Sequence, residues 1–104
     1  MNIEISIPHG SYPASIRSQI EEKLEGLDRF DERTQNLKVI LDKDNVEHRV
    51  ELIATRAGGP VLVVDSKADS LSKALDEAID RIGRAMRKRR EKETDLNRGR
   101  HHPA

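Results

Sequence analysis

The chain has 104 residues and no cysteine, and its 19 basic and 19 acidic side chains cancel in charge. A chain of this length suits one domain that folds without disulfides, and the lack of cysteine excludes thiol chemistry. No run of about 18 apolar residues is present, which excludes a membrane-spanning helix, and the first residues lack the pattern of a signal peptide, so we expect a cytoplasmic protein.

A strand is predicted at about residues 1–8, where apolar and polar residues alternate. A helix is expected over about 13–29, because Pro13 suits a first helical position and apolar residues then recur in one stripe. This stripe consists of Ile16, Ile20, Leu24 and Leu27. The outer face of the helix is acidic, with Glu21, Glu22, Glu25 and Asp28.

Three strands are predicted next, at about 36–43, 46–56 and 61–69. Turns are expected at Asp44-Asn45 and at Gly58-Gly59-Pro60. The middle strand is expected to place four apolar residues on one face: Val46, Val50, Leu52 and Ala54.

The last predicted element is a helix over about 70–94, capped by Asp69 or Ser70. Its apolar stripe ends at Met86, and the next position on that face is Arg89. We therefore expect the last two turns to project past the core, and residues 95–104 to be a disordered tail. The stripe consists of Leu71, Leu75, Ala78, Ile79, Ile82 and Met86.

The order β-α-β-β-β-α predicts one α+β domain over residues 1–94, a two-layer sandwich with both helices on one face of a four-stranded sheet. The first two strands are expected to be parallel, joined by a right-handed crossover. The other sheet face would be wet, with some apolar residues pointing toward it: Ile40, Ile53, Val61 and Val63.

Catalytic groups are not apparent, so we expect a protein that is not an enzyme and needs no cofactor or metal. His9 and His48 are isolated, and Gly58-Gly59 precedes a strand rather than a helix N-terminus. His101 and His102 are an option for weak metal binding, although a disordered end is favoured. Tyr12 and Phe30 are the only aromatic residues, so any nucleic acid would be bound through phosphates and shape.

Positive charge gathers at the end of the chain. Residues 1–80 carry 10 basic and 16 acidic side chains, a net of −6, whereas residues 81–104 carry 9 and 3, a net of +6. A solvated helix end is one interpretation and a polyanion-binding end is the other. The helix macrodipole accounts for two or three basic residues, but the segment 81–92 holds seven.

The spacing of these basic residues favours the polyanion. Arg81, Arg84, Lys88 and Lys92 share one flank of the helix, where like charges three or four residues apart repel. Arginine predominates, which suits forked contacts with phosphate. A membrane surface is disfavoured, because the core needs the apolar stripe that an interfacial helix would have to expose.

Two segments resemble one protein family. KADSLSKALDEAIDRIGRAMRKRREK, residues 67–92, and SIRSQIEEKLEGLDRF, residues 15–30, are similar to the two helices of the ribosome hibernation-promoting factors. These proteins are also called ribosome-associated inhibitors or sigma-54 modulation proteins. The resemblance covers about residues 1–94 in the same order of elements.

The resemblance implies a fold like a double-stranded-RNA-binding domain and a partner, the small subunit (16S-type rRNA) of a 70S-type ribosome. The family occupies the channel for mRNA and for A- and P-site tRNA, which stops translation and preserves idle ribosomes in stationary phase or stress. The implied rRNA-binding residues here are Lys23, Arg81, Arg84, Arg87, Lys88, Arg90 and Lys92, with Arg17 and Arg29 in second place.

Two departures from the family leave alternatives open. The first helix is more acidic than is usual, and long members have a further domain that pairs two ribosomes. We expect a short form, or else a piece of a longer chain. Short forms either assist ribosome pairing with a second hibernation factor or hold single ribosomes inactive. The remaining alternatives are a general structured-RNA-binding protein and a protein–protein regulator that uses the basic helix.

Overall fold

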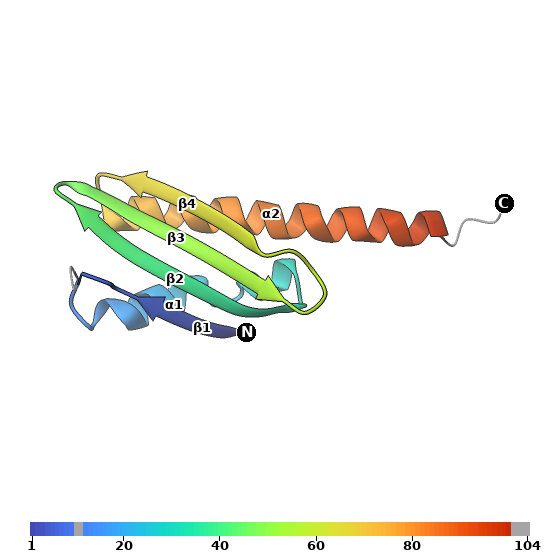
Figure 1. Cartoon of the computed structure of the whole chain (residues 1–104), viewed down its shortest axis with the longest axis horizontal. Helices are drawn as coiled ribbons and strands as arrows, with labels where there is room; N and C mark the ends of the chain where they lie inside the picture. Colours follow the sequence, from blue (N-terminus) through green and yellow to red (C-terminus); the bar gives the residue numbers. More distant parts are fainter. Residues whose placement is uncertain (10–11, 101–104) are drawn as a thin grey trace.

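The computed structural model describes the backbone of residues 1–9 and 12–100, and their side chains as far as Thr94. Figure 1 shows a two-layer α+β fold, so the predicted class and order of elements are confirmed. No helix in the described part of the chain is long and apolar enough to cross a membrane. The elements are β1 (Asn2–Ser6), α1 (Ile16–Leu24), the 3-10 helix η1 (Leu27–Phe30), β2 (Thr34–Asp44), β3 (Glu47–Arg56), β4 (Leu62–Ala68) and α2 (Leu71–Arg100).

The four strands form one sheet in the order β1-β2-β3-β4. β1 pairs with β2 in parallel, with Ile5 opposite Val39, as the predicted crossover requires. The two following pairings are antiparallel. The β2–β3 turn lies one residue later than predicted: Asp44 pairs with Glu47, and Asn45 has a φ of 56°.

Val46 was wrongly placed on the core face, because it lies in this turn and is 78% exposed. A two-residue hairpin needs positive φ at its first position, which asparagine tolerates better than most residues. The strand therefore begins after Val46.

The core lies between the sheet and the two helices, which cover the same face (Figure 1). The opposite face is open to solvent as expected, with Val61 54% and Val63 58% exposed and with Ile40 and Ile53 half-buried. The buried apolar residues come from every layer: Ile5, Ile20, Leu24, Leu27, Leu37, Val39, Leu41, Val50, Leu52, Ala54, Ala74, Leu75, Ala78, Ile82 and Met86.

The first helix is shorter than the predicted span of 13–29. α1 ends at Leu24, and Gly26 then adopts the left-handed conformation with a φ of 85°. Glycine reaches this conformation at little cost, so the chain turns there and restarts as η1. Leu27 still reaches the core, at 4% exposed, because the short 3-10 helix returns it to that side.

The second helix begins as predicted and ends later. The Ser70 hydroxyl accepts a hydrogen bond of 3.2 Å from the backbone N–H of Lys73, so Ser70 is the cap. α2 continues to Arg100, so residues 95–100 of the predicted tail are helical. His101 and His102 lie outside the described residues.

Candidate nucleic-acid interface

After Met86 the apolar face of α2 is continued by two charged residues, Arg89, which is largely buried, and Glu93, which is partly buried. The Arg89 side chain is only 9% exposed. It donates hydrogen bonds of 2.6 and 3.1 Å to Asp31 Oδ2 and one of 2.7 Å to the carbonyl oxygen of Pro60. The apolar core ends at Met86, as the stripe predicts, but Arg89 still packs against the rest of the domain, so the turn that holds it does not project past the core as expected. A charged residue can continue a buried stripe when its partners are buried with it.

Four residues form a charge cluster at this point: Asp31, Arg56, Arg89 and Glu93. The Arg56 side chain, which is 4% exposed, donates a hydrogen bond of 3.2 Å to Asp31 and also binds Glu93. Glu93 accepts a further bond of 3.3 Å from Arg33. The cluster thus ties α2 to β3 and to the segment after η1.

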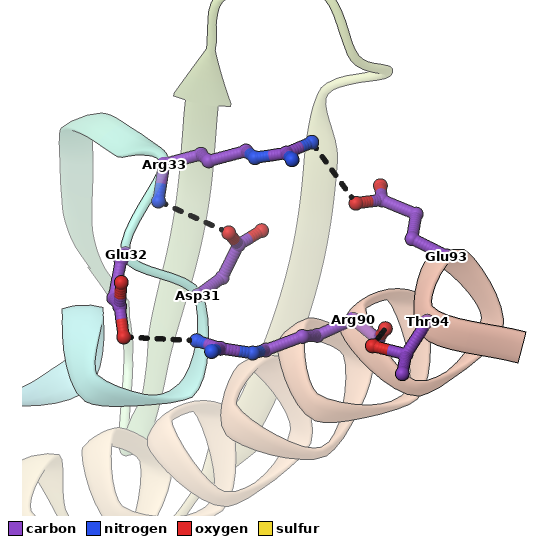
Figure 2. A pocket seen from close by; sticks show the side chains of 6 residues that line it. All are labelled: Asp31, Glu32, Arg33, Arg90, Glu93 and Thr94. Atoms are coloured by element: carbon purple, nitrogen blue, oxygen red, sulfur yellow. Dashed lines mark hydrogen bonds and ion pairs between the residues drawn. The ribbon is translucent and has the colours of Figure 1, made fainter. Parts of the chain in front are cut away.

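A shallow polar pocket lies beside the charge cluster, between the segment after η1 and α2 (Figure 2). In this view Arg33 points toward Glu93, and Glu32 faces Arg90 at 3.2 Å. The lining therefore carries both signs of charge. It does not offer a uniformly positive surface to an anion.

Both carboxylates of the charge cluster stay ionised at neutral pH. Burial alone would raise the pKa of Asp31, but hydrogen bonds from Arg89 and the Arg33 backbone, with the charges of Arg89 and Arg56, hold it below its ordinary value. The hydrogen bond from Arg56 likewise holds the pKa of Glu93 low, against a smaller effect of desolvation. The charge cluster is therefore a fixed anchor for the basic part of α2.

All seven predicted RNA-binding residues are exposed, but several are already paired with groups of the protein itself. Lys23 lies 3.0 Å from Asp76, and Arg84 lies 2.9 Å from Asp80 in the preceding turn. The Arg81 guanidinium donates a hydrogen bond of 2.6 Å to the backbone carbonyl of Asp65 in β4. Exposed pairs of this kind contribute only about 0–1 kcal/mol to stability, so a phosphate can replace them.

Lys23 stands apart from the other predicted residues. Its partner Asp76 lies on α2 eight positions before Arg84, which is about 12 Å along the helix axis. Arg17, one of the two residues predicted in second place, donates a hydrogen bond of 2.9 Å to the carbonyl oxygen of Ile5. It therefore belongs to the junction between β1 and α1. The structure does not bring these two residues together with the basic end of α2.

Arg87 and Arg29 are brought together instead. Their guanidinium carbons lie 4.9 and 4.8 Å from the centre of the Phe30 ring. Lys88 and Lys92 are exposed and have no carboxylate partner within the described side chains. Among the described side chains, the basic end of α2 therefore offers cations stacked on Phe30 and cations without a carboxylate partner.

A family model described as "Sigma 54 modulation protein / S30EA ribosomal protein" matches residues 3–94. The chain belongs to this family. The match spans both segments that carried the resemblance, so the predicted family is confirmed. Among the described residues, no group of three or more His, Cys, Asp or Glu is placed to hold a metal ion.

Curated relatives of this S30EA family chain carry one name. A ribosome hibernation promoting factor of Pseudomonas putida is 26% identical over 99 residues, which cover 95% of this chain and 96% of the relative. A protein of the same name from Azotobacter vinelandii is 24% identical over 95% of this chain and 92% of its own length.

Two solved structures share the S30EA fold of this chain. The N-terminal domain of Thermus thermophilus Protein Y is 28% identical, with a TM-score of 0.74 over 85% of this chain and 98% of that domain. A ribosomal subunit interface protein from Coxiella burnetii has the same TM-score over 88% of this chain and 99% of its own, but is 16% identical and supports the fold alone.

Two glycines of the S30EA domain are expected to respond oppositely to substitution by alanine. A Cβ at Gly59 would overlap the Arg56 guanidinium, which the charge cluster holds in place, so Gly59→Ala should cost about 1–3 kcal/mol. A Cβ at Gly83 would meet Phe30 at 3.4 Å, an ordinary contact, and alanine favours the helix by up to about 1 kcal/mol. Urea denaturation measures both changes, and a loss of stability at Gly83 would contradict this packing.

Proposed function

We propose that this S30EA family protein binds the small ribosomal subunit through rRNA phosphates, in the channel used by mRNA and tRNA. Occupying that channel inhibits translation and keeps idle ribosomes intact during stress or stationary phase. Membership of the family supports the proposal, as do the relatives named ribosome hibernation promoting factors. The observation that carries it is the exposed basic flank of a helix anchored by the charge cluster.

The chemistry of this flank suits a folded RNA. Arg84 is 76% exposed, and Lys88 and Lys92 on the same flank are exposed as well. The strands hold no Phe, Tyr or Trp for base stacking, which favours contacts with phosphates and A-form shape. We assign these contacts to Lys23, Arg81, Arg84, Arg87, Lys88, Arg90 and Lys92, with Arg17 and Arg29 in supporting places.

The rigid mounting of α2 also supports binding to one defined surface. Arg89 and Glu93, one turn apart, both bind residues outside α2. The basic side chains between and beside them are therefore presented at a fixed angle to the sheet. A partner that is recognised by shape needs such a fixed arrangement of charges.

Competition with tRNA tests the occlusion directly. Purified small subunits are loaded with mRNA and P-site tRNA, and the affinity of the labelled protein is compared with that for empty subunits. We expect the loaded subunits to lose most of their affinity and added protein to inhibit translation in vitro. Equal affinity for loaded and empty subunits would contradict binding in the channel.

The two alternative functions predict other results. Equal affinity for any duplex RNA would indicate a general RNA-binding protein. Capture of a protein partner after RNase treatment would indicate a protein–protein regulator.

A further inference from the structure

Phe30 is the only phenylalanine of the chain and lies where η1 meets α2. Its ring is half-buried, whereas the flanking Arg29 and the facing Arg87 are exposed. The two guanidinium groups come from different elements and both lie over this one ring, at 4.8 and 4.9 Å from its centre. An aromatic ring attracts a cation at such distances through its quadrupole.

The position of the ring is fixed by the core. A Cβ built on Gly83 of α2 would lie 3.4 Å from Cε2 of Phe30 and 3.9 Å from the side chain of Leu27. Since Gly83 has no side chain, the ring lies directly against the backbone of α2. Leu27 is buried at 4% exposure and supports the same contact. Phe30 is therefore in place before any partner binds.

Stacking and ion pairing use different parts of a guanidinium group. An ion pair with a carboxylate occupies the N–H edge, as in Arg84 with Asp80 and Arg90 with Glu32. Stacking on a ring engages the flat face and leaves the N–H edge open. Within the described side chains, neither Arg29 nor Arg87 has a carboxylate partner. These two arginines are thus held in position without losing their charge or their donors.

We infer that Arg29 and Arg87, ordered by Phe30, form a phosphate clamp that grips the backbone of an RNA strand where η1 meets α2. Both distances are measured from the same ring centre, so the guanidinium carbons lie no more than about 10 Å apart. One phosphate, or neighbouring phosphates of one strand, can bridge that span with forked hydrogen bonds. The inference rests on the proposed function. It gives Arg29, which the resemblance put in second place, a role in phosphate binding equal to that of Arg87.

The test separates ordering from charge. Phe30→Leu keeps an apolar side chain and every charge but removes the aromatic face, so it should weaken binding to purified small subunits roughly tenfold. The slope of log K against log salt should stay unchanged, because no cation is lost. Phe30→Tyr keeps the ring and should bind as the wild type does. Thermal melting establishes that each variant is folded.

Substitution of the arginines completes the test and leaves the contacts of Phe30 with Gly83 unchanged. Arg29→Gln and Arg87→Gln should each weaken binding and each lower the salt slope by about 0.7–0.9. Lys43→Gln, at an exposed position on β2, is the matched control and should have little effect. The double variant Phe30→Leu/Arg87→Gln should lose less than the product of the single losses.

Two results would overturn the clamp, and they differ in what they mean for the proposed function. If Phe30→Leu and Arg29→Gln bind as the wild type does while loss of charge at Arg84 and Lys88 abolishes binding, the clamp is wrong and the proposed function stands. If the wild type does not bind small subunits at all, both are wrong.

Discussion

Asp31→Ala should lower the free energy of unfolding by about 3 kcal/mol, because it leaves two buried guanidinium groups without their shared carboxylate. Arg56 and the Asp31 side chain are each 4% exposed, and Arg89 is 9% exposed. The expected loss lies at the lower end of the range for breaking a buried pair, since Glu93 still binds Arg56. Chemical denaturation measures the change.

The neighbouring residue provides the control for this prediction. The Glu32 side chain is 77% exposed and pairs with Arg90 at 3.2 Å. Glu32→Ala removes the same type of charge from the same segment, yet it should cost less than about 1 kcal/mol because the pair is at the surface. Equal losses for the two variants would show that the charge cluster contributes no more than a surface ion pair.

The same carboxylate predicts how stability depends on pH. Since the folded state lowers the pKa of Asp31, its contribution is complete above the ordinary aspartate pKa of about 4. It is lost as the pH falls below that value, through the lowered pKa of the folded state. The acid side of the stability profile should therefore be steeper for the wild type than for Asp31→Ala. Parallel stability profiles of the two proteins would contradict the assignment of this acid loss of stability to Asp31.

Charge reversal on the exposed flank should have the largest effect on binding. The double variant Arg84→Glu/Lys88→Glu should weaken binding to small subunits roughly 60-fold or more at about 0.1 M salt, since each phosphate contact releases a counterion. The slope of log K against log salt should fall in magnitude by about 2. A titration of labelled protein at several salt concentrations measures both quantities.

The acidic face of α1 is the matched control for this reversal. Glu21→Lys/Glu22→Lys changes the same number of charges on exposed residues of α1. It should change the affinity much less than Arg84→Glu/Lys88→Glu does. Equal effects of the two double variants would mean that the RNA is bound by a different surface.

Periodic elements of the fold could be predicted from the sequence. Alternation in β2 and the stripe from Leu75 to Met86 place each side chain correctly, because burial on one face dictates the pattern. The break at Gly26 was missed, since a glycine inside a helical pattern is often tolerated. The hairpin at Val46 was missed because an apolar residue in a turn continues the alternation of a strand.

The candidate site could be predicted only in part. Exposed cations at steps of three and four are visible in the sequence, and Arg84 and Lys88 lie where the spacing placed them. The role of Arg89 was not visible, because its partner Asp31 is 58 positions away and a charge on the apolar stripe suggests the end of the core. The sequence identifies Phe30 as one of two aromatic residues, but it does not show that two arginines are the neighbours of the ring in space.

Sedimentation of the protein with purified small ribosomal subunits tests the central claim most directly. Sucrose gradients are run at about 0.1 M and about 0.5 M salt, and the protein is located in each fraction. With the six phosphate contacts assigned to side chains of α2, the affinity should fall by roughly four orders of magnitude between these conditions. The protein should therefore travel with the subunits at low salt and remain at the top of the gradient at high salt. If it stays at the top at about 0.1 M salt, or sediments equally at both, it does not bind ribosomal RNA through the basic flank of α2.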